Sequence, residues 1–103
     1  MTKKSAKWNL GIDTTDFGKI VFSLDDGKKK IQKDFSVRPQ ESDKILEYLG
    51  QFLKTNKILH PKSYILNLLV YKGKGSFTGL RIAAAIAQAL SLAWGVPVKV
   101  ASK

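Results

Sequence analysis

The chain has 103 residues, of which 44% are hydrophobic, and it carries a formal charge of +10 at pH 7. This apolar content is enough for the core of one domain, and it excludes a chain that is disordered over its whole length. Because the sequence has no cysteine, disulfides, thiolate catalysis and cysteine zinc sites are excluded as well.

Three strands open the predicted fold. Residues 8–13, 19–24 and 30–37 each alternate apolar with polar side chains, which is typical of strands with one buried face. Asp25-Asp26-Gly27 lies between the second and third of these segments. Its residues tolerate positive φ and favour a hairpin turn. We therefore expect three antiparallel strands.

A helix, a strand, a second helix and a last strand follow. The first helix, residues 41–55, is predicted from apolar side chains at helical spacing: Ile45, Leu46, Leu49, Phe52 and Leu53. Residues 64–70 form an apolar run that favours a strand buried on both faces. A second helix is predicted over 78–94, and it ends there because Gly95 and Pro97 do not continue a helix. Residues 96–100 add a fifth strand. The expected fold is α/β, with a mixed five-stranded sheet.

No repeat, linker or low-complexity tract divides the chain. We expect a single domain over residues 1–103, in which 1–7 form a flexible basic tail. Since no long apolar stretch follows this basic start, neither a signal peptide nor a membrane span is expected. The expected location is the cytoplasm, with no membrane partner.

Lysine dominates the positive charge, with sixteen lysines against two arginines. Lysine is a solvated point charge, poorly suited to bidentate recognition of bases or phosphates. Such charge favours long-range attraction to nucleic acid without sequence recognition. Two interpretations stay open: a weak electrostatic contact with nucleic acid or another polyanion, and a solvated lysine-rich surface without a partner.

Two turns follow predicted strands and hold the candidate phosphate-binding residues. A strand-end acid with hydroxyl side chains can approach a metal-bound phosphate, and glycines before a helix form an anion-binding hollow. The alternative is structural, with Asp13 accepting hydrogen bonds from its own turn and the glycines allowing close helix packing. A Walker loop is excluded, because no lysine–hydroxyl pair has the required spacing. The candidates are Asp13, Thr14, Thr15, Gly73, Gly75, Ser76, Thr78, Gly79 and Arg81.

Catalytic candidates are scarce. His60 is the only histidine and stands beside Pro61 in a predicted loop, where we expect it to be exposed to solvent. No nucleophile–base pair and no zinc helix supports proteolysis. We therefore expect no catalytic residue and no metal site.

The helix over 78–94 has two apolar stripes and only Arg81 and Gln88 on its polar face. A helix on the surface of one sheet normally buries a single stripe. We expect one stripe to pack on the sheet and the other on a second helix, which is either the predicted helix 41–55 or a partner chain. The candidate partner-binding residues are Leu80, Ala83, Ala84 and Ala87 in one stripe, and Ile82, Ala85 and Ala89 in the other.

Several segments resemble a known family. Residues 12–15, IDTT, resemble the IDTS segment that opens TsaB-type (YeaZ-like) proteins, and residues 73–82, GKGSFTGLRI, resemble that family's GPGSFTGLRI. Residues 94–102 are similar to the family's stretch after this helix. The resemblance covers residues 10–102 and corresponds to the family's N-terminal lobe; Lys74 and Ala83 replace the usual proline and glycine.

The resemblance implies a single lobe of the actin-like ATPase (ASKHA, ribonuclease H-like) fold. It also implies a non-catalytic scaffolding or activating subunit of a TsaD-like enzyme that makes threonylcarbamoyladenosine (t6A) in tRNA, with a homodimer as a second arrangement. No cofactor is expected on this chain alone, and ATP or ADP only at a subunit interface. Two alternatives are a stand-alone basic nucleic-acid-binding module and an ATP-hydrolysing enzyme, for which a second lobe is lacking.

Overall fold

The computed structural model describes residues 7–16, 18–73 and 77–102. The expected order of elements is confirmed, with one additional short helix, α2, where a loop was predicted. The elements are β1 (Trp8–Asp13), β2 (Lys19–Asp25), β3 (Lys30–Ser36), the 3-10 helix η1 (Pro39–Lys44), α1 (Ile45–Thr55), α2 (Pro61–Tyr64), β4 (Ile65–Lys72), α3 (Phe77–Trp94) and β5 (Val98–Ser102).

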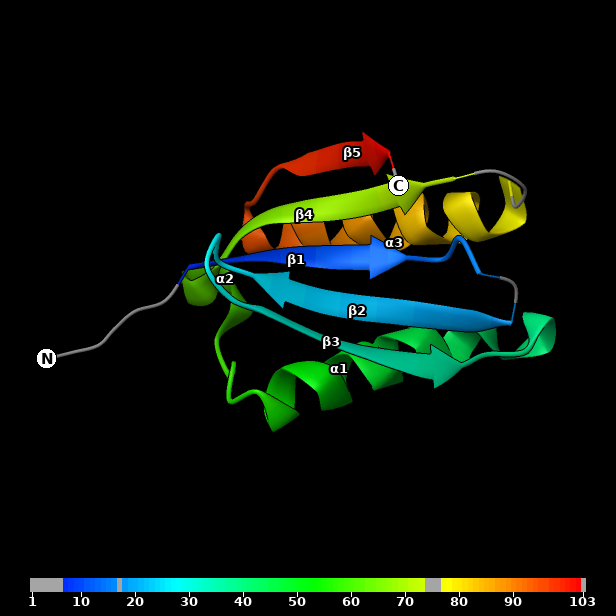
Figure 1. Cartoon of the computed structure of the whole chain (residues 1–103), viewed down its shortest axis with the longest axis horizontal. Helices are drawn as coiled ribbons and strands as arrows, with labels where there is room; N and C mark the ends of the chain where they lie inside the picture. The colour runs from blue at the N-terminus through cyan, green and yellow to red at the C-terminus, as the bar shows by residue number, and fades with distance from the viewer. Residues whose placement is uncertain (1–6, 17, 74–76, 103) are drawn as a thin grey trace, which may run out of the picture.

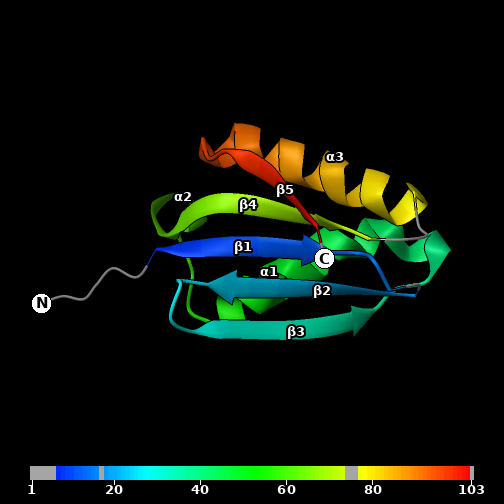
Figure 2. The same cartoon turned by 45° about the horizontal axis from the view of Figure 1, so that its top comes forward.

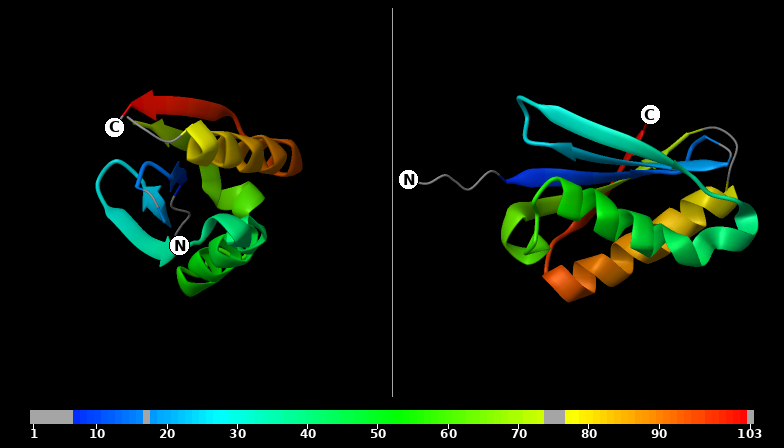
Figure 3. Two further views of the ribbon diagram at one scale, coloured as in Figure 1. Left: turned by 90° about the vertical axis from the view of Figure 1, so that its right-hand side faces the viewer. Right: turned by 90° about the horizontal axis from the view of Figure 1, so that it is seen from below.

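The five strands form one mixed sheet in the order β3-β2-β1-β4-β5 (Figure 1). β1 pairs antiparallel with β2, and β2 with β3, whereas β1–β4 and β4–β5 are parallel. The connections from β3 to β4 and from β4 to β5 run in the same direction across the sheet. Right-handed crossovers therefore place α1 and α3 on the same face, and the other face is left open (Figure 3). The predicted α/β lobe is confirmed.

The core lies between the sheet and the two long helices. Phe22 of β2 stacks on Phe52 of α1 with ring centroids 6.0 Å apart and meets Phe35 of β3 edge-on at 5.9 Å. These aromatic contacts attach α1 to the β2–β3 side of the sheet. The buried hydrophobic residues of β1, β2, β4, α1 and α3 are Leu10, Ile12, Ile20, Phe22, Leu24, Ile45, Leu49, Phe52, Leu53, Ile65, Leu68, Val70, Ala83 and Ala87.

The start of the first long helix differs from the prediction. Residues 39–44 form a 3-10 segment in which Glu41 has non-helical dihedral angles (φ −109°, ψ 22°), and the α-helix begins at Ile45. The Glu41 carboxylate accepts a hydrogen bond from the Arg38 backbone N–H at 3.1 Å, which stabilises this local turn. Leu46, predicted as a core residue, is 55% exposed, because one step of 100° from Ile45 turns it away from the sheet.

β4 is not buried on both faces as predicted. Leu68 and Val70 are buried, but Leu69 and Tyr71 are only half-buried, because the helices cover a single face of the sheet. On the open face, Tyr71 packs over Gly11 of β1. A Cβ at Gly11 would lie 2.8 Å from Cε2 of Tyr71 and closer still to Oγ of Ser23. A side chain at position 11 would therefore force Ser23 and Tyr71 to shift.

Candidate functional site

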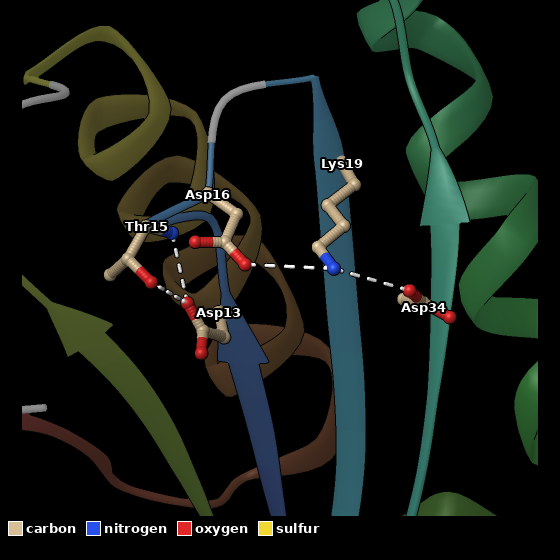
Figure 4. Close-up of polar contacts among 5 residues, drawn as sticks. All are labelled: Asp13, Thr15, Asp16, Lys19 and Asp34. Carbon is tan, nitrogen blue, oxygen red and sulfur yellow. Dashed lines mark hydrogen bonds and ion pairs between the residues drawn. The ribbon is translucent and has the colours of Figure 1, made fainter.

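Asp13, at the end of β1, lies almost fully buried in a turn of its own making (Figure 4). Its Oδ1 accepts hydrogen bonds from the backbone N–H of Thr15 at 2.9 Å and from the Thr15 hydroxyl at 2.6 Å. This is an Asp-centred turn, in which the carboxylate replaces a backbone acceptor. The geometry matches the structural interpretation of Asp13, and a phosphate role for Asp13, Thr14 and Thr15 stays a prediction.

The two predicted turns converge at one end of the sheet, where β1 and β4 terminate. β1 and β4 are parallel with Asp13 opposite Tyr71, so the residues that follow both strands emerge side by side. A Cβ at Gly73 would lie 3.1 Å from Cγ2 of Thr15, which shows how closely the two segments approach. Gly75, Ser76 and the side chain of Thr78 lie outside the described residues. Gly79 falls in the first turn of α3, also outside the described side chains, and Arg81 is exposed.

A hollow of about 480 Å³ lies beside Asp13 on the open face of the sheet. Lys19 stands in its wall and forms ion pairs with Asp16 at 3.6 Å and with Asp34 at 3.3 Å (Figure 4). The lining therefore mixes both signs of charge, rather than concentrating the positive charge that a phosphate needs. Within residues 7–16, 18–73 and 77–102, no three histidine or carboxylate side chains are placed to hold a metal ion.

The Lys19 ion pairs were not predicted from the sequence. Asp34 lies opposite Val21 in the β2–β3 ladder, two positions along from Lys19. The Asp25-Asp26-Gly27 turn fixes the register of β2 against β3. Counting back along both strands from this turn would have predicted that Lys19 lies near Asp34. His60 is exposed in the loop before α2.

The two stripes of α3 meet different environments. Ala83 and Ala87 are fully buried, and α3 packs chiefly on β4, with smaller contacts to β1, β5 and α2. Leu80 and Ala84, of the same stripe, and Ile82, of the other, are half-buried. Ala85 and Ala89 are exposed. The stripe with Ala83 and Ala87 thus belongs to the sheet, and α1 is not a principal neighbour of α3.

Four apolar residues form what we call the exposed α3 stripe: Ala85, Ala89, Leu92 and Ala93. Leu92 is 88% exposed and was not among the predicted partner-binding residues. Its spacing of seven residues from Ala85 and three from Ala89 would have placed it on the same helix face. On α1, Leu46 and Gly50 are also exposed and lie one turn apart. None of the helices in the described part of the chain is long and apolar enough to cross a membrane.

Comparison with known structures shows which proteins share this fold. YeaZ from Pseudomonas aeruginosa superposes with a TM-score of 0.77 over 93% of this chain, at 22% sequence identity. The chain has the YeaZ fold. A protein described as uncharacterized, with similarity to peptidase YeaZ from the same organism, gives the same values. The chain spans 44% and 43% of these two structures, which is less than half of their length.

RuvC from Thermus thermophilus, solved with a Holliday junction substrate, is a more distant neighbour of the YeaZ-like lobe. Its TM-score is 0.59 at 14% identity, over 93% of this chain and 64% of RuvC. No protein-family model and no curated protein matches the sequence. The predicted resemblance to YeaZ and the predicted single lobe of the actin-like, ribonuclease H-like fold are therefore confirmed at the level of the fold.

Proposed function

We propose that this chain is a non-catalytic accessory subunit that pairs helix to helix with a TsaD-like transferase in the formation of t6A in tRNA. The observation that carries the proposal is the exposed α3 stripe, an apolar surface that faces solvent in the isolated chain. The choice of partner is supported by the IDTT and GKGSFTGLRI segments and by the YeaZ fold.

The composition of the exposed α3 stripe suits contact with another helix. A surface helix normally turns polar side chains to solvent, but here Ala85, Ala89 and Ala93 are exposed together with Leu92. Alanine side chains allow a second helix to approach to the short end of the usual interaxial range, about 8 Å. Complete burial of a leucine side chain such as Leu92 stabilises a contact by about 1.5–3 kcal/mol.

α1 extends this surface, because both long helices lie on the same face of the sheet (Figure 3). Leu46 is 55% exposed, and Gly50, one turn later, has no atom within 4 Å of the place where a Cβ would stand. A partner presenting two helices would therefore meet α1 and α3 together, as in four-helix packing. When the partner is absent, the proposal has two copies of this chain pair through the same surface. Such a contact would be isologous, with the same residues of both copies meeting across a two-fold axis.

In this proposal the chemistry belongs to the partner. Asp13 is engaged by Thr15, and the neighbouring hollow has mixed charge. ATP or ADP would bind only between the two subunits, with the converging Thr15 and Gly73 segments at one side.

Co-purification from the native cell tests the proposal. The tagged chain should recover a TsaD-like subunit, and Ala89→Glu should lose it, because the new carboxylate would be buried without a partner. Gln32→Glu is the matched control, since Gln32 lines the hollow on the open face of the sheet. A TsaD-like subunit that is absent from the wild-type preparation, or recovered equally with Ala89→Glu, would contradict the proposal.

A further inference from the structure

Positive charge is concentrated at one end of the molecule, where β1, β4 and β5 begin and where α1 and α3 end (Figure 2). Four separate segments contribute to it: the start of β1, the β2–β3 turn, the end of α1 with the loop that follows, and α2. We call this surface the basic end. Its lysines, all exposed, are Lys7, Lys28, Lys29, Lys30, Lys54, Lys57 and Lys62.

Contacts within the structure bring these segments together. Nζ of Lys7 donates a hydrogen bond to the backbone oxygen of Ser63 in α2 at 2.7 Å. In the sheet, Lys30 lies opposite Asp25, which lies opposite Asn9 of β1. The β2–β3 turn, the start of β1 and α2 therefore share one end of the fold, although they are up to 56 residues apart in sequence.

Acidic residues neutralise only part of the charge at the basic end. Asp25 and Asp26 are the acids there, and both accept hydrogen bonds from backbone N–H groups of the turn, those of Gly27, Lys28 and Lys29. The seven lysines less these two acids leave a formal charge of +5 (7 − 2) at this end. The ion pairs recorded for residues 7–16, 18–73 and 77–102 involve only Lys19 and Lys44, at the opposite end. The remaining acids also lie toward that opposite end: Asp13, Asp16, Asp34, Glu41, Asp43 and Glu47.

We propose that the basic end binds the phosphate backbone of double-stranded nucleic acid without reading its bases. The molecule measures 25 by 24 Å across its long axis, and a duplex presents one charge for about every 1.7 Å of its length. Several lysines can therefore meet phosphates at once. A single-strand site would need exposed aromatic rings for base stacking, whereas Trp8 and Tyr64 at this end are partly buried against the core. The site does not use the exposed α3 stripe, so its test is independent of the proposed pairing.

The test is the binding of a labelled RNA duplex, followed by fluorescence anisotropy as salt rises from about 50 to 200 mM. Two triple variants lose the same formal charge. The basic-end variant is Lys28→Gln, Lys29→Gln and Lys62→Gln; the control variant is Arg38→Gln, Lys44→Gln and Lys72→Gln, at the opposite end. Circular dichroism establishes that both are folded.

For the wild type, the logarithm of affinity should fall linearly with the logarithm of salt concentration. The basic-end variant should bind about tenfold or more weakly at the lowest salt, with a salt slope reduced by about 0.9 for each phosphate that it no longer neutralises. The control variant should stay close to the wild type. Equal losses in both variants, no duplex binding by the wild type, or tighter binding to anionic phosphatidylserine vesicles than to RNA at the same salt would overturn the proposal.

Discussion

Ala87 and Ala89 lie two residues apart on α3 and meet opposite environments, since Ala87 is fully buried against the core and Ala89 is exposed. The separation follows from helix geometry, because two residues correspond to a rotation of about 160° between the side chains. α3 therefore presents one stripe of small residues to the sheet and a second one to solvent. The first contributes to the stability of the lobe, and the second is available to a partner.

Glutamate at these two positions should have different effects on folding. At Ala87 a buried, unpaired carboxylate costs several kcal/mol, comparable to the stability of a small domain, so Ala87→Glu should be unfolded at 25 °C. At Ala89 the carboxylate is solvated, and a surface change of this kind typically alters stability by about 0.5 kcal/mol or less. Thermal melts followed by circular dichroism measure both. A cooperative melt for Ala87→Glu near that of the wild type would contradict the assignment of the two stripes.

Two glycine-to-alanine changes should alter the free energy of unfolding in opposite directions. Gly11→Ala places a Cβ 2.8 Å from the Tyr71 ring, and overpacking of this kind costs about 1–3 kcal/mol. Gly50→Ala meets no atom within 4 Å at an exposed position of α1, so it should stabilise the protein by about 0.5–1 kcal/mol. Urea unfolding gives both free energies. A Gly11→Ala protein as stable as the wild type would show that Tyr71 does not pack over β1.

The β2–β3 turn should respond to acid. Hydrogen bonds from the backbone N–H groups of Lys28 and then Lys29 lower the pKa of Asp26 from its ordinary value of 3.8. A carboxyl group whose pKa is lower in the folded state contributes stability above the unfolded pKa, and this contribution is lost as pH falls through the folded pKa. In an NMR titration the Asp26 carboxyl should change below pH 3.8, and the protection of the turn amides against exchange, relative to their intrinsic rates at each pH, should fall with it. Titration of Asp26 at or above 3.8 would contradict these hydrogen bonds, and Asp26→Asn is the control without the transition.

The chain alone should not turn over ATP. The Asp13 carboxylate is engaged by Thr15, and the adjacent hollow pairs Lys19 with two acids, so neither a metal–phosphate complex nor a free base is favoured there. Phosphate release should equal the blank for the wild type and for Asp13→Ala alike. Turnover above the blank that disappears in Asp13→Ala would establish an ATPase instead.

Periodicity in the sequence was sufficient to predict the five strands and the two long helices, but not the short helix α2, the 3-10 start of α1 or the exposure of single residues. Alternation over residues 8–13 and the hairpin residues Asp25-Asp26-Gly27 predicted β1 and the β2–β3 pair, because these signals are local. The exposure of Leu46 depends on how α1 is rotated against the sheet, and the partial burial of β4 depends on which sheet face the helices cover. That choice follows from the handedness of the crossovers, a property of the whole topology.

For the candidate surfaces, too, the sequence predicted the type of residue but not where it lies in the fold. Helical spacing predicted two apolar stripes in α3, but only the packed structure assigns Ala87 to the sheet and Ala89 to solvent. Net charge predicted attraction to polyanions, but the basic end is assembled from four segments that pairing brings together. Segments distant in sequence cannot be placed on one surface by composition or local spacing.

The most direct test of the proposed pairing is calorimetric titration of the purified TsaD-like subunit of the native cell into this protein. The wild type and Gln32→Glu should bind with the same dissociation constant. Ala89→Glu should remain folded and bind at least about 30-fold more weakly, the effect of removing an interaction of about 2 kcal/mol or more at an interface centre. Folded Ala89→Glu that binds as tightly as the wild type, or a wild type that does not bind at all, would contradict pairing through the exposed α3 stripe.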